Sequence, residues 1–457
     1  MQTRYFILIL FLISLLNPNQ AHAAPRADVE ADSATLDFPN TVTFSATLNS
    51  NAAINAVTLE YGSEQLTCGE VIAKAFPDVN PGPSTNVSWT WDMRQSGSLP
   101  PGTTIWWRWR YTDESGQEFV SDTQTVIWLD DQHDWKTLSE DKVNIHYYGK
   151  SEDFARTMLD AGLEGLRLNK AQAGMTADVP VNIYVYPSYE EMRDAVLYEP
   201  QWTGGQAFSD FSIIIMGVSG DAEWDKDTVI HELTHILVGR NAFTCIGSIP
   251  TWLNEGLAVY NEGVLDKDMK AQLDQAIQAN TLFPVRTLGG SFSEIPEKAY
   301  LSYAQSYSVV KFMVETYGQE KMNRLLTDLS NAVPIDEALT EVYGVDTDGL
   351  DAAWRESVGA APLVLAEATA QPTPTQVPTY VPIAGIPQVL TPTPGAIPTS
   401  SSSGNNDQTE SQPGQSSPPV VLTIALICFC LLFLLIIGVV VLGVALRNNK
   451  GKGGKNG

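Results

Sequence analysis

The feature that most constrains this chain is an apolar run near its C terminus. The segment from Val420 to Leu446 consists almost entirely of Val, Leu, Ile, Ala and Phe. A helix that crosses a bilayer needs about 20 such residues, so we expect one transmembrane helix over residues 420–446. A short basic tail, residues 447–457, follows it, and basic residues favour the cytoplasmic side. The sequence therefore predicts a single-pass protein of the cell membrane, with its N-terminal ectodomain outside and its C-terminal tail in the cytoplasm.

The N terminus has the pattern of a cleaved secretion signal. Arg4 precedes an apolar run that ends at Leu16, and Ala21-His22-Ala23 is the small-x-small pattern that signal peptidase accepts. This run is too short to span about 30 Å of hydrocarbon, which argues against a short N-terminal anchor. We therefore expect residues 1–23 to be a signal peptide.

Charge and cysteine content limit the partners and the cross-links. The formal net charge is −26, and such a field repels polyanions, so we expect no nucleic-acid partner. Cys428 and Cys430 lie within the predicted transmembrane helix. Export permits a disulfide between the other two cysteines, Cys68 and Cys245, but they fall in different predicted domains, and the sequence leaves their pairing open. No pattern in the sequence predicts the oligomeric state.

Residues 27–130 have the composition of an all-β domain. Short alternating stretches at 41–48 and 105–111 are separated by turn residues, among them a predicted hairpin turn at 113–116. This spacing is typical of a β-sandwich, and the arrangement resembles fibronectin type III or immunoglobulin-like domains. The stretch 105–111 alternates Trp with Arg, which predicts either a buried Trp face with an outer Arg face or a surface that stacks a ligand.

The chain changes character at about residue 131. Strand patterns at 143–148 and 181–185 flank an amphipathic helix at 152–172, and the chain is mainly helical after residue 226. We expect residues 131–360 to form one α/β domain. Residues 366–419 are rich in Pro, Thr and Ser, a composition that cannot bury a core, and they predict a disordered stalk.

The strongest chemical signal is His231-Glu232-Leu233-Thr234-His235, an H-E-x-x-H pattern in a predicted helix. His231 and His235 are four residues apart, so both imidazoles lie on one helical face and are able to bind one ion. The apolar residues around them predict a buried opposite face. These residues are Val229, Ile230, Leu233, Ile236 and Leu237.

A third ligand is predicted at Glu255, in the stretch Trp252-Leu253-Asn254-Glu255-Gly256, after nineteen residues that follow His235. Pro250 suits the first turn of a second helix, which carries this glutamate. The paired motifs resemble the gluzincin branch of zinc metallopeptidases, and the overall pattern over 131–360 is similar to the peptidase MA-like family. The resemblance implies a zincin-like catalytic domain with one Zn²⁺ bound by His231, His235 and Glu255.

The resemblance also implies residue roles. Glu232 is the expected general base, and Tyr303 is the candidate oxyanion donor, with Tyr300 and Tyr307 as competitors. Residues 204–207, followed by 213–216, resemble the turn and edge strand that lie beside a zincin active-site helix, although an ordinary buried strand explains 213–216 equally well.

Two departures from the family pattern matter. The chain has no G-x-M-E-N stretch before the predicted active-site helix, which argues against aminopeptidase specificity. Val259 stands where thermolysin-like enzymes place an acidic partner for a zinc-bound histidine, so another group must orient that imidazole.

The sequence thus predicts a multidomain chain, in which an N-terminal all-β sandwich is followed by an α/β gluzincin-like catalytic domain, a stalk and one transmembrane helix. The predicted activity is hydrolysis of internal peptide bonds in a peptide or protein substrate. Two alternatives stay open at this point. One is a surface binding or adhesion protein with a non-catalytic zincin-like domain, and the other is a zinc hydrolase of a non-peptide amide.

Overall fold

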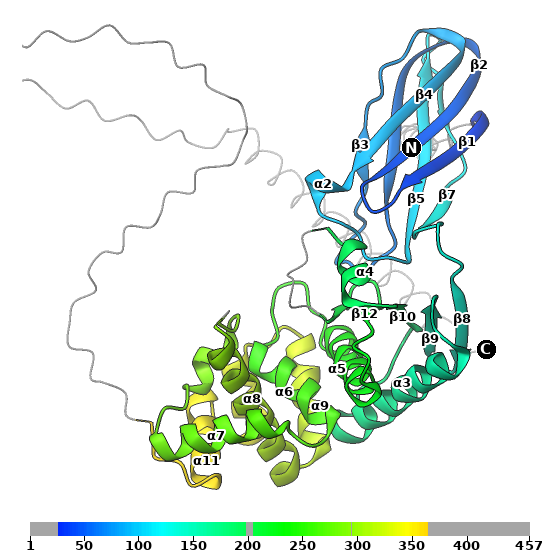
Figure 1. Ribbon diagram of the computed structural model, residues 1–457. Helices are drawn as coiled ribbons and strands as arrows, with labels where there is room; N and C mark the ends of the chain where they lie inside the picture. The colour runs from blue at the N-terminus through cyan, green and yellow to red at the C-terminus, as the bar shows by residue number, and fades with distance from the viewer. Residues whose placement is uncertain (1–25, 198–203, 294, 364–457) are drawn as a thin grey trace, which may run out of the picture. The chain divides into compact units, whose positions relative to one another are not determined.

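The structure is a computed structural model that describes residues 26–197, 204–293 and 295–363 (Figure 1). No helix within these ranges is both long and apolar enough to span a bilayer. Four predicted segments lie outside the described residues: the signal peptide (1–23), the stalk (366–419), the transmembrane helix (420–446) and the basic tail (447–457).

The N-terminal region is a seven-stranded antiparallel sheet organised around one long strand, β2. Residues 41–49 of β2 pair with β1 and β4, whereas residues 54–63 pair with β5, after a register shift between Asn49 and Ile54. One strand therefore serves two groups of neighbours that share one apolar core. The elements are β1 (Asp28–Asp37), β2 (Thr41–Ser63), β3 (Ala73–Ala75), β4 (Gly82–Asp92), α2 (Met93–Ser96), β5 (Thr103–Asp113), β6 (Glu118–Val120) and β7 (Gln124–Trp128).

Strand β5 shows the alternation that the sequence predicts. Trp107 and Trp109 are buried in the core, while Arg108 and Arg110 point outward and pair with Glu60 of β2. Burial opposes ionisation of Glu60, but its hydrogen bonds to the two arginines lower its pKa from 4.5 to about 2. The arginines are therefore part of a structural ion cluster, which confirms the prediction of a buried Trp face and an outer Arg face.

The next region contains a five-stranded sheet with the order β11-β12-β10-β9-β8. The central strand β10 runs parallel to β9 and β12, and the two outer strands are antiparallel to their neighbours. The predicted mixed α/β arrangement is therefore present. The strands are β8 (Lys136–Glu140), β9 (Val143–Tyr147), β10 (Val181–Tyr186), β11 (Gly205–Phe208) and β12 (Ile213–Gly217).

Alternate residues of this sheet belong to two different cores. Val181 and Ile183 of β10 pack in the large core that also contains residues of α3 (Glu152–Ala173) and α5 (Ala222–Asn241). Tyr184 and Tyr186 of the same strand pack in a second core with Met192 of α4 (Tyr189–Asp194). The sheet is therefore covered on both faces, as its run of apolar residues requires.

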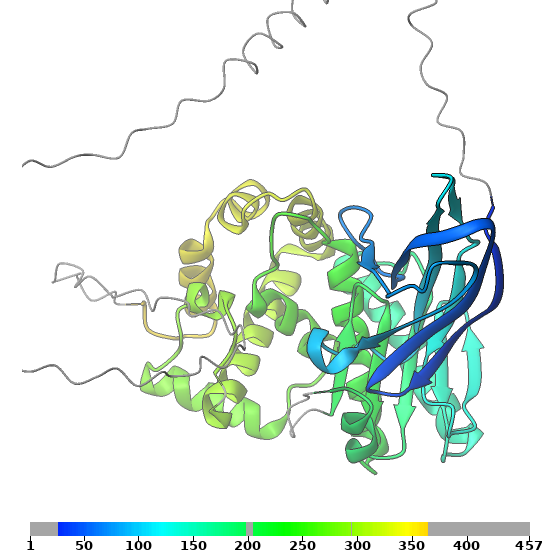
Figure 2. The ribbon, with the colours of Figure 1, turned by 90° about the horizontal axis from the view of Figure 1, so that it is seen from above.

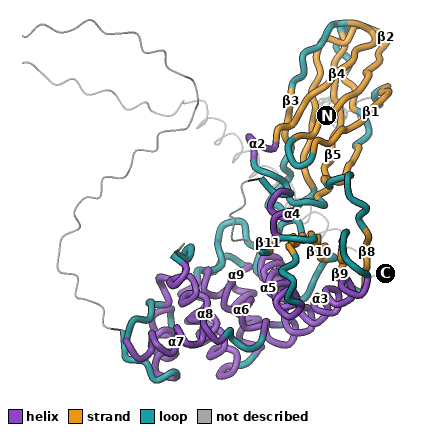
Figure 3. Tube along the Cα trace, in the orientation of Figure 1, coloured by secondary structure: helices purple, strands orange, loops and turns teal. Residues whose placement is uncertain are grey.

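From residue 251 onward the described chain is helical, and Figure 3 shows no strand in this part. Figure 2 shows these helices, coloured green to yellow, from above. The elements are α6 (Thr251–Glu262), α7 (Lys267–Ala279), the 3₁₀ helix η1 (Val285–Gly289), α8 (Pro296–Tyr317), α9 (Gln319–Ser330), α10 (Ile335–Tyr343) and α11 (Thr347–Ser357).

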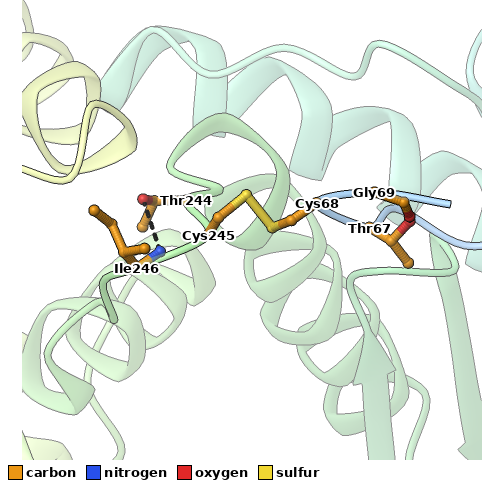
Figure 4. Close-up of a disulfide and its surroundings, with 6 residues drawn as sticks. All are labelled: Thr67, Cys68, Gly69, Thr244, Cys245 and Ile246. Carbon is orange, nitrogen blue, oxygen red and sulfur yellow. Dashed lines mark hydrogen bonds between the residues drawn. A yellow bond between two sulfur atoms is a disulfide. The ribbon is translucent and has the colours of Figure 1, made fainter. Parts of the chain in front are cut away.

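The two cysteines whose pairing the sequence left open form a disulfide. Cys68, in the loop after β2, is bonded to Cys245, in the loop between α5 and α6 (Figure 4). Beside it, the backbone N–H of Leu66 donates to the carbonyl of Asp210 at 2.8 Å. A covalent bond therefore ties the β region to the loop that joins the two helices carrying the predicted metal ligands.

Candidate metal centre

Helix α5 places the two histidines as the sequence predicts. Asp221 caps the helix, because its side chain accepts hydrogen bonds from the backbone N–H groups of Glu223 and Trp224. Its apolar face is buried in the large core, with Val229, Leu233, Ile236 and Leu237 fully covered. The opposite face carries His231 and His235, whose side chains are only 18% and 14% exposed.

Helix α6 brings the third side chain to the same point. Oε2 of Glu255 lies 3.5 Å from Nε2 of His231 and 3.4 Å from Nε2 of His235, and the two nitrogens are 3.1 Å apart. These three residues form a group that is able to hold a metal ion. Oε2 of Glu255 is buried and has no hydrogen-bond partner, which is unusual for a carboxylate oxygen. Two imidazoles and one carboxylate are ligands of catalytic zinc, so these residues fit Zn²⁺.

The electrostatics of the group favour positive charge at this point. Burial alone would keep the imidazole of His231 neutral, yet the nearby carboxylates of Glu255 and Glu262 raise its pKa well above 6.5. The pKa of His235 is raised for the same reason, by Glu255. Burial opposes ionisation of Glu255 as well, but the two histidines hold its pKa below the usual 4.5. The carboxylates would thus compensate the charge of a cation held among the ring nitrogens.

Two side chains orient the imidazoles, and the sequence motifs of the metal ligands predicted neither of them. Nδ1 of His231 donates a hydrogen bond to Glu262, and Nδ1 of His235 donates to Oδ1 of Asn254 at 3.0 Å. Both bonds leave Nε2 directed at the common point, which is the arrangement that metal-binding histidines use. Val259, the position expected to be acidic in thermolysin-like enzymes, is instead buried.

The spacing of Glu262 from Glu255 is a sequence pattern that predicts its place beside the site. Glu262 lies seven residues after Glu255, which is two helical turns, so both carboxylates are on one face of α6. Asn254 directly precedes Glu255 and carried no comparable signal. The carboxylate that orients the imidazole therefore lies at residue 262, about one helical turn beyond position 259.

The predicted edge strand lies beside the predicted base. β11 is the end strand among the described strands of the five-stranded sheet, and it contacts α5. A Cβ atom on Gly205 would lie 2.9 Å from Cγ2 of Thr228 and 3.1 Å from Cγ of Glu232. The backbone of β11 therefore passes directly over Glu232, and only glycine permits this approach without a shift.

Comparison with known proteins now identifies the domain. Residues 161–360 match the Peptidase MA superfamily. This part of the chain is a Peptidase MA superfamily domain. The match and the His231, His235 and Glu255 group together identify residues 161–360 as a zinc metallopeptidase domain. No protein of curated function matches the sequence.

Solved structures give only distant similarities. The M1 zinc metallopeptidase of Deinococcus radiodurans is 11% identical, with 76% of this chain and 96% of that chain covered and a TM-score of 0.32. OgpA of Akkermansia muciniphila is 12% identical, with 25% of this chain covered and a TM-score of 0.20, and only 31% of its own length is spanned. BhCBM56 is 12% identical, with coverages of 23% and 96% and a TM-score of 0.15. None of these similarities bears on the activity of the peptidase domain.

A buried polar network fixes α5 of the peptidase domain against its neighbours. Nδ2 of Asn169, on α3, donates to Oγ1 of Thr234 at 3.0 Å, and Nδ2 of Asn261, on α6, donates to Oδ1 of Asn169 at 3.0 Å. Thr234 lies within the H-E-x-x-H motif, and Asn261 adjoins Glu262. The network therefore holds the two ligand-bearing helices in one register.

Helix α8 lies very close to α6 in the peptidase domain, and this brings Tyr303 toward the site. A Cβ atom on Gly256 would lie 2.5 Å from the carbonyl oxygen of Ser306, so the two backbones are nearly in contact. Burial raises the pKa of Tyr303 above 10, and the carboxylates of Glu255 and Glu232 raise it further. Of its competitors, Tyr300 is 49% exposed and Tyr307 donates to the carbonyl of Gly263. The charges of Glu255 and Glu232 therefore act on the phenol of Tyr303.

Proposed function

We propose that the chain is an endopeptidase that cleaves internal bonds of peptides or proteins outside the cell, with one Zn²⁺ held by His231, His235 and Glu255. When bound there, zinc supplies a water molecule of lowered pKa and polarises the scissile carbonyl. The observation that carries this proposal is the convergence of three ligand atoms, one of them the unpartnered Oε2 of Glu255, next to Glu232. An endopeptidase is favoured because the chain lacks the G-x-M-E-N stretch.

Glu232 is proposed to move the protons of the reaction. It follows His231 on α5 and is absent from the metal-binding group, so its carboxylate is available to accept a proton from the attacking water. Burial raises its pKa above 4.5, and the charge of Glu255 adds to this effect, while the two histidines oppose it. A raised pKa makes the carboxylate a stronger base, and the proton then passes to the departing amine.

Tyr303 is proposed to stabilise the oxyanion. Its raised pKa keeps the phenol protonated at neutral pH, so it remains a hydrogen-bond donor. The substrate itself is proposed to bind as an added strand along β11, whose edge passes beside Glu232. An oxyanion donor and a strand edge that binds the substrate are features that a peptidase needs and that a structural metal site does not need.

We propose further that the enzyme is exported and anchored in the cell membrane by residues 420–446, with residues 366–419 as a stalk. The apolar run and the basic residues that follow it support anchoring, and the bond between Cys68 and Cys245 is of a kind that persists in oxidising compartments. For the N-terminal region we propose a fibronectin III or immunoglobulin-like sandwich. The division of β2 between two groups of strands supports this assignment.

Digestion of a proteome-derived peptide library by the full-length, zinc-loaded protein tests the proposed activity, with Glu232→Gln as the matched control. We expect new peptide termini with the wild type and none with the variant, while both proteins contain one zinc per chain. If both proteins bind zinc and neither cleaves any peptide, the peptidase proposal is wrong and a non-peptide amide becomes the substrate class to examine.

A further inference from the structure

Trp224 is an exposed tryptophan on the helix that carries the metal ligands. Its exposure is 59%, whereas five other tryptophans of the described chain are almost completely buried: Trp107, Trp109, Trp128, Trp252 and Trp354. A single exposed apolar side chain is common on protein surfaces and by itself indicates nothing. The position of Trp224 on α5, the helix that carries His231 and His235, is what indicates a functional role.

Trp224 lies on the same face of α5 as the two histidines. It precedes His231 by seven residues and His235 by eleven, and both spacings return to one side of an α-helix. Thr228 lies between them on this face, and its methyl group is the atom that a Cβ on Gly205 of β11 would approach most closely. Seven residues correspond to about 10 Å along the helix axis. Trp224 is therefore attached to α5 about 10 Å along the helix axis from His231, toward the N-terminal end of the helix.

The contacts of β11 show in which direction this strand runs along α5. At its start, Gly205 lies beside Thr228 and Glu232. Just beyond its end, Oγ of Ser209 donates to the carbonyl of His235 at 3.0 Å. The strand thus runs in the same direction as the helix.

A bound peptide then has a defined polarity. If it adds to β11 in the antiparallel sense, which is the more stable pairing, it runs opposite to α5. Its residues on the C-terminal side of the scissile bond are directed toward the N-terminal end of the helix, where Trp224 lies. The residues on the N-terminal side are directed along β11 toward Phe208.

We propose that Trp224 is a specificity-determining residue that contacts a large apolar side chain on the third substrate residue after the scissile bond. An extended chain advances about 3.3 Å per residue, so the third residue lies about 10 Å from the scissile carbonyl. Side chains alternate along a strand, so the first and third residues share one face and the second does not. This inference rests on the proposed peptidase function, and it adds the substrate position that this chain selects.

Acidic side chains near Trp224 define the competing explanation. Asp221 and Asp227 lie within one turn of it on α5, while Glu223 is paired with Lys226 at 2.6 Å. Carboxylates at this end of the site would select a lysine or arginine in the substrate instead of an apolar side chain. A preference for an apolar side chain requires the indole of Trp224, whereas a preference for lysine or arginine does not.

The test uses the full-length, zinc-loaded protein and a peptide series that varies only the third residue after a mapped cleavage site. We expect kcat/KM to be roughly tenfold higher with Phe or Leu than with Ala or Ser at this position. Trp224→Ala should abolish the preference, and Trp224→Phe should retain most of it. Phe76→Ala, which removes another exposed aromatic side chain from the loop after β3, should leave the preference unchanged.

Binding measurements separate this inference from the proposed activity. Fluorescence anisotropy with the Glu232→Gln protein reports peptide affinity without cleavage, and Trp224→Ala in that background should weaken the Phe peptide roughly tenfold and the Ala peptide little. Cleavage with no preference at the third residue, or with a Lys or Arg preference that survives Trp224→Ala, overturns the assignment of Trp224. Failure of the wild type to cleave any peptide, together with failure of Glu232→Gln to bind any, overturns the peptidase proposal itself.

Discussion

The N-terminal β region and the peptidase domain each bury a cluster of charged side chains, and the two clusters differ in one respect. Glu60 is 2% exposed, and its two oxygens are paired with Lys74, Arg108 and Arg110. Oε2 of Glu255 is also buried but accepts no hydrogen bond. A buried carboxylate oxygen is costly unless it is paired. The first cluster is therefore neutralised by permanently charged side chains, whereas the second pairs its carboxylate only with two histidines, whose nitrogens are able to bind a metal ion instead.

The largest expected effect concerns the proposed function of the second cluster. Replacing Glu232 by Gln keeps the side-chain shape but removes the base, so kcat should fall by about a thousandfold. Zinc content, measured by atomic absorption, and the thermal melting temperature should stay close to those of the wild type. A variant that retains most of the activity would assign the base to another group.

Zinc binding should depend on Glu255 and be indifferent to Glu60. Glu255→Gln removes a ligand, so zinc affinity, measured by competition with a chromogenic chelator, should fall more than the 10- to 100-fold expected for loss of a residue that only orients a ligand. Glu60→Gln should leave that affinity unchanged. Equal zinc affinities for wild type and Glu255→Gln would remove this glutamate from the metal site.

The free energy of unfolding, in contrast to zinc affinity, should depend more on Glu60 than on Glu255. Glu60→Gln leaves Lys74, Arg108 and Arg110 without their buried carboxylate, and it should lower the free energy of unfolding by about 3 kcal/mol, the low end for a buried pair because the cations are partly exposed. Denaturant titration followed by tryptophan fluorescence measures this loss, since Trp107 and Trp109 adjoin the cluster in β5. In metal-free protein, Glu255→Gln should cost less than Glu60→Gln. A larger loss of stability for Glu255→Gln than for Glu60→Gln would contradict the proposed difference between the two clusters.

The Glu60 cluster also predicts an acid dependence. Its pKa is lowered in the folded state from 4.5 to about 2, so its contribution to stability is present above pH 4.5 and is lost as the pH falls toward 2. Stability of the wild type should therefore decline through this range more steeply than that of Glu60→Gln. Thermal melting at pH 5, 4, 3 and 2 measures both slopes, and parallel slopes would show that Glu60 does not carry this dependence.

The smallest expected effect concerns the group that orients His231. Glu262→Gln retains a hydrogen-bond acceptor but removes the charge, and zinc affinity should fall about 10-fold, at the low end of the usual range for such partners. Asn254→Asp, which adds a charge beside His235, is the matched comparison and should not weaken zinc binding. If Glu262→Gln binds zinc as the wild type does, its contact with His231 is not needed for the metal.

Much of the fold followed from local patterns. The predicted strands at 143–148 and 181–185 correspond to β9 and β10, and the helix predicted at 152–172 corresponds to α3. The buried face of α5 contains the predicted apolar residues. These features depend on spacings of two to four residues, which the sequence displays directly. Pro250 was expected inside the first turn of α6 and instead precedes it as the capping residue.

What the sequence by itself determined is the chemistry of the centre: two histidines on one helical turn, Glu232 between them, and Glu255 on the next helix. Only the tertiary structure decided what surrounds it. The partners Glu262 and Asn254, the nearness of Tyr303, the approach of Gly205 to Glu232 and the bond from Cys68 to Cys245 all join different elements. Periodicity fixes which side chains share a face of one element. It does not fix which faces meet, because that depends on how the whole core packs.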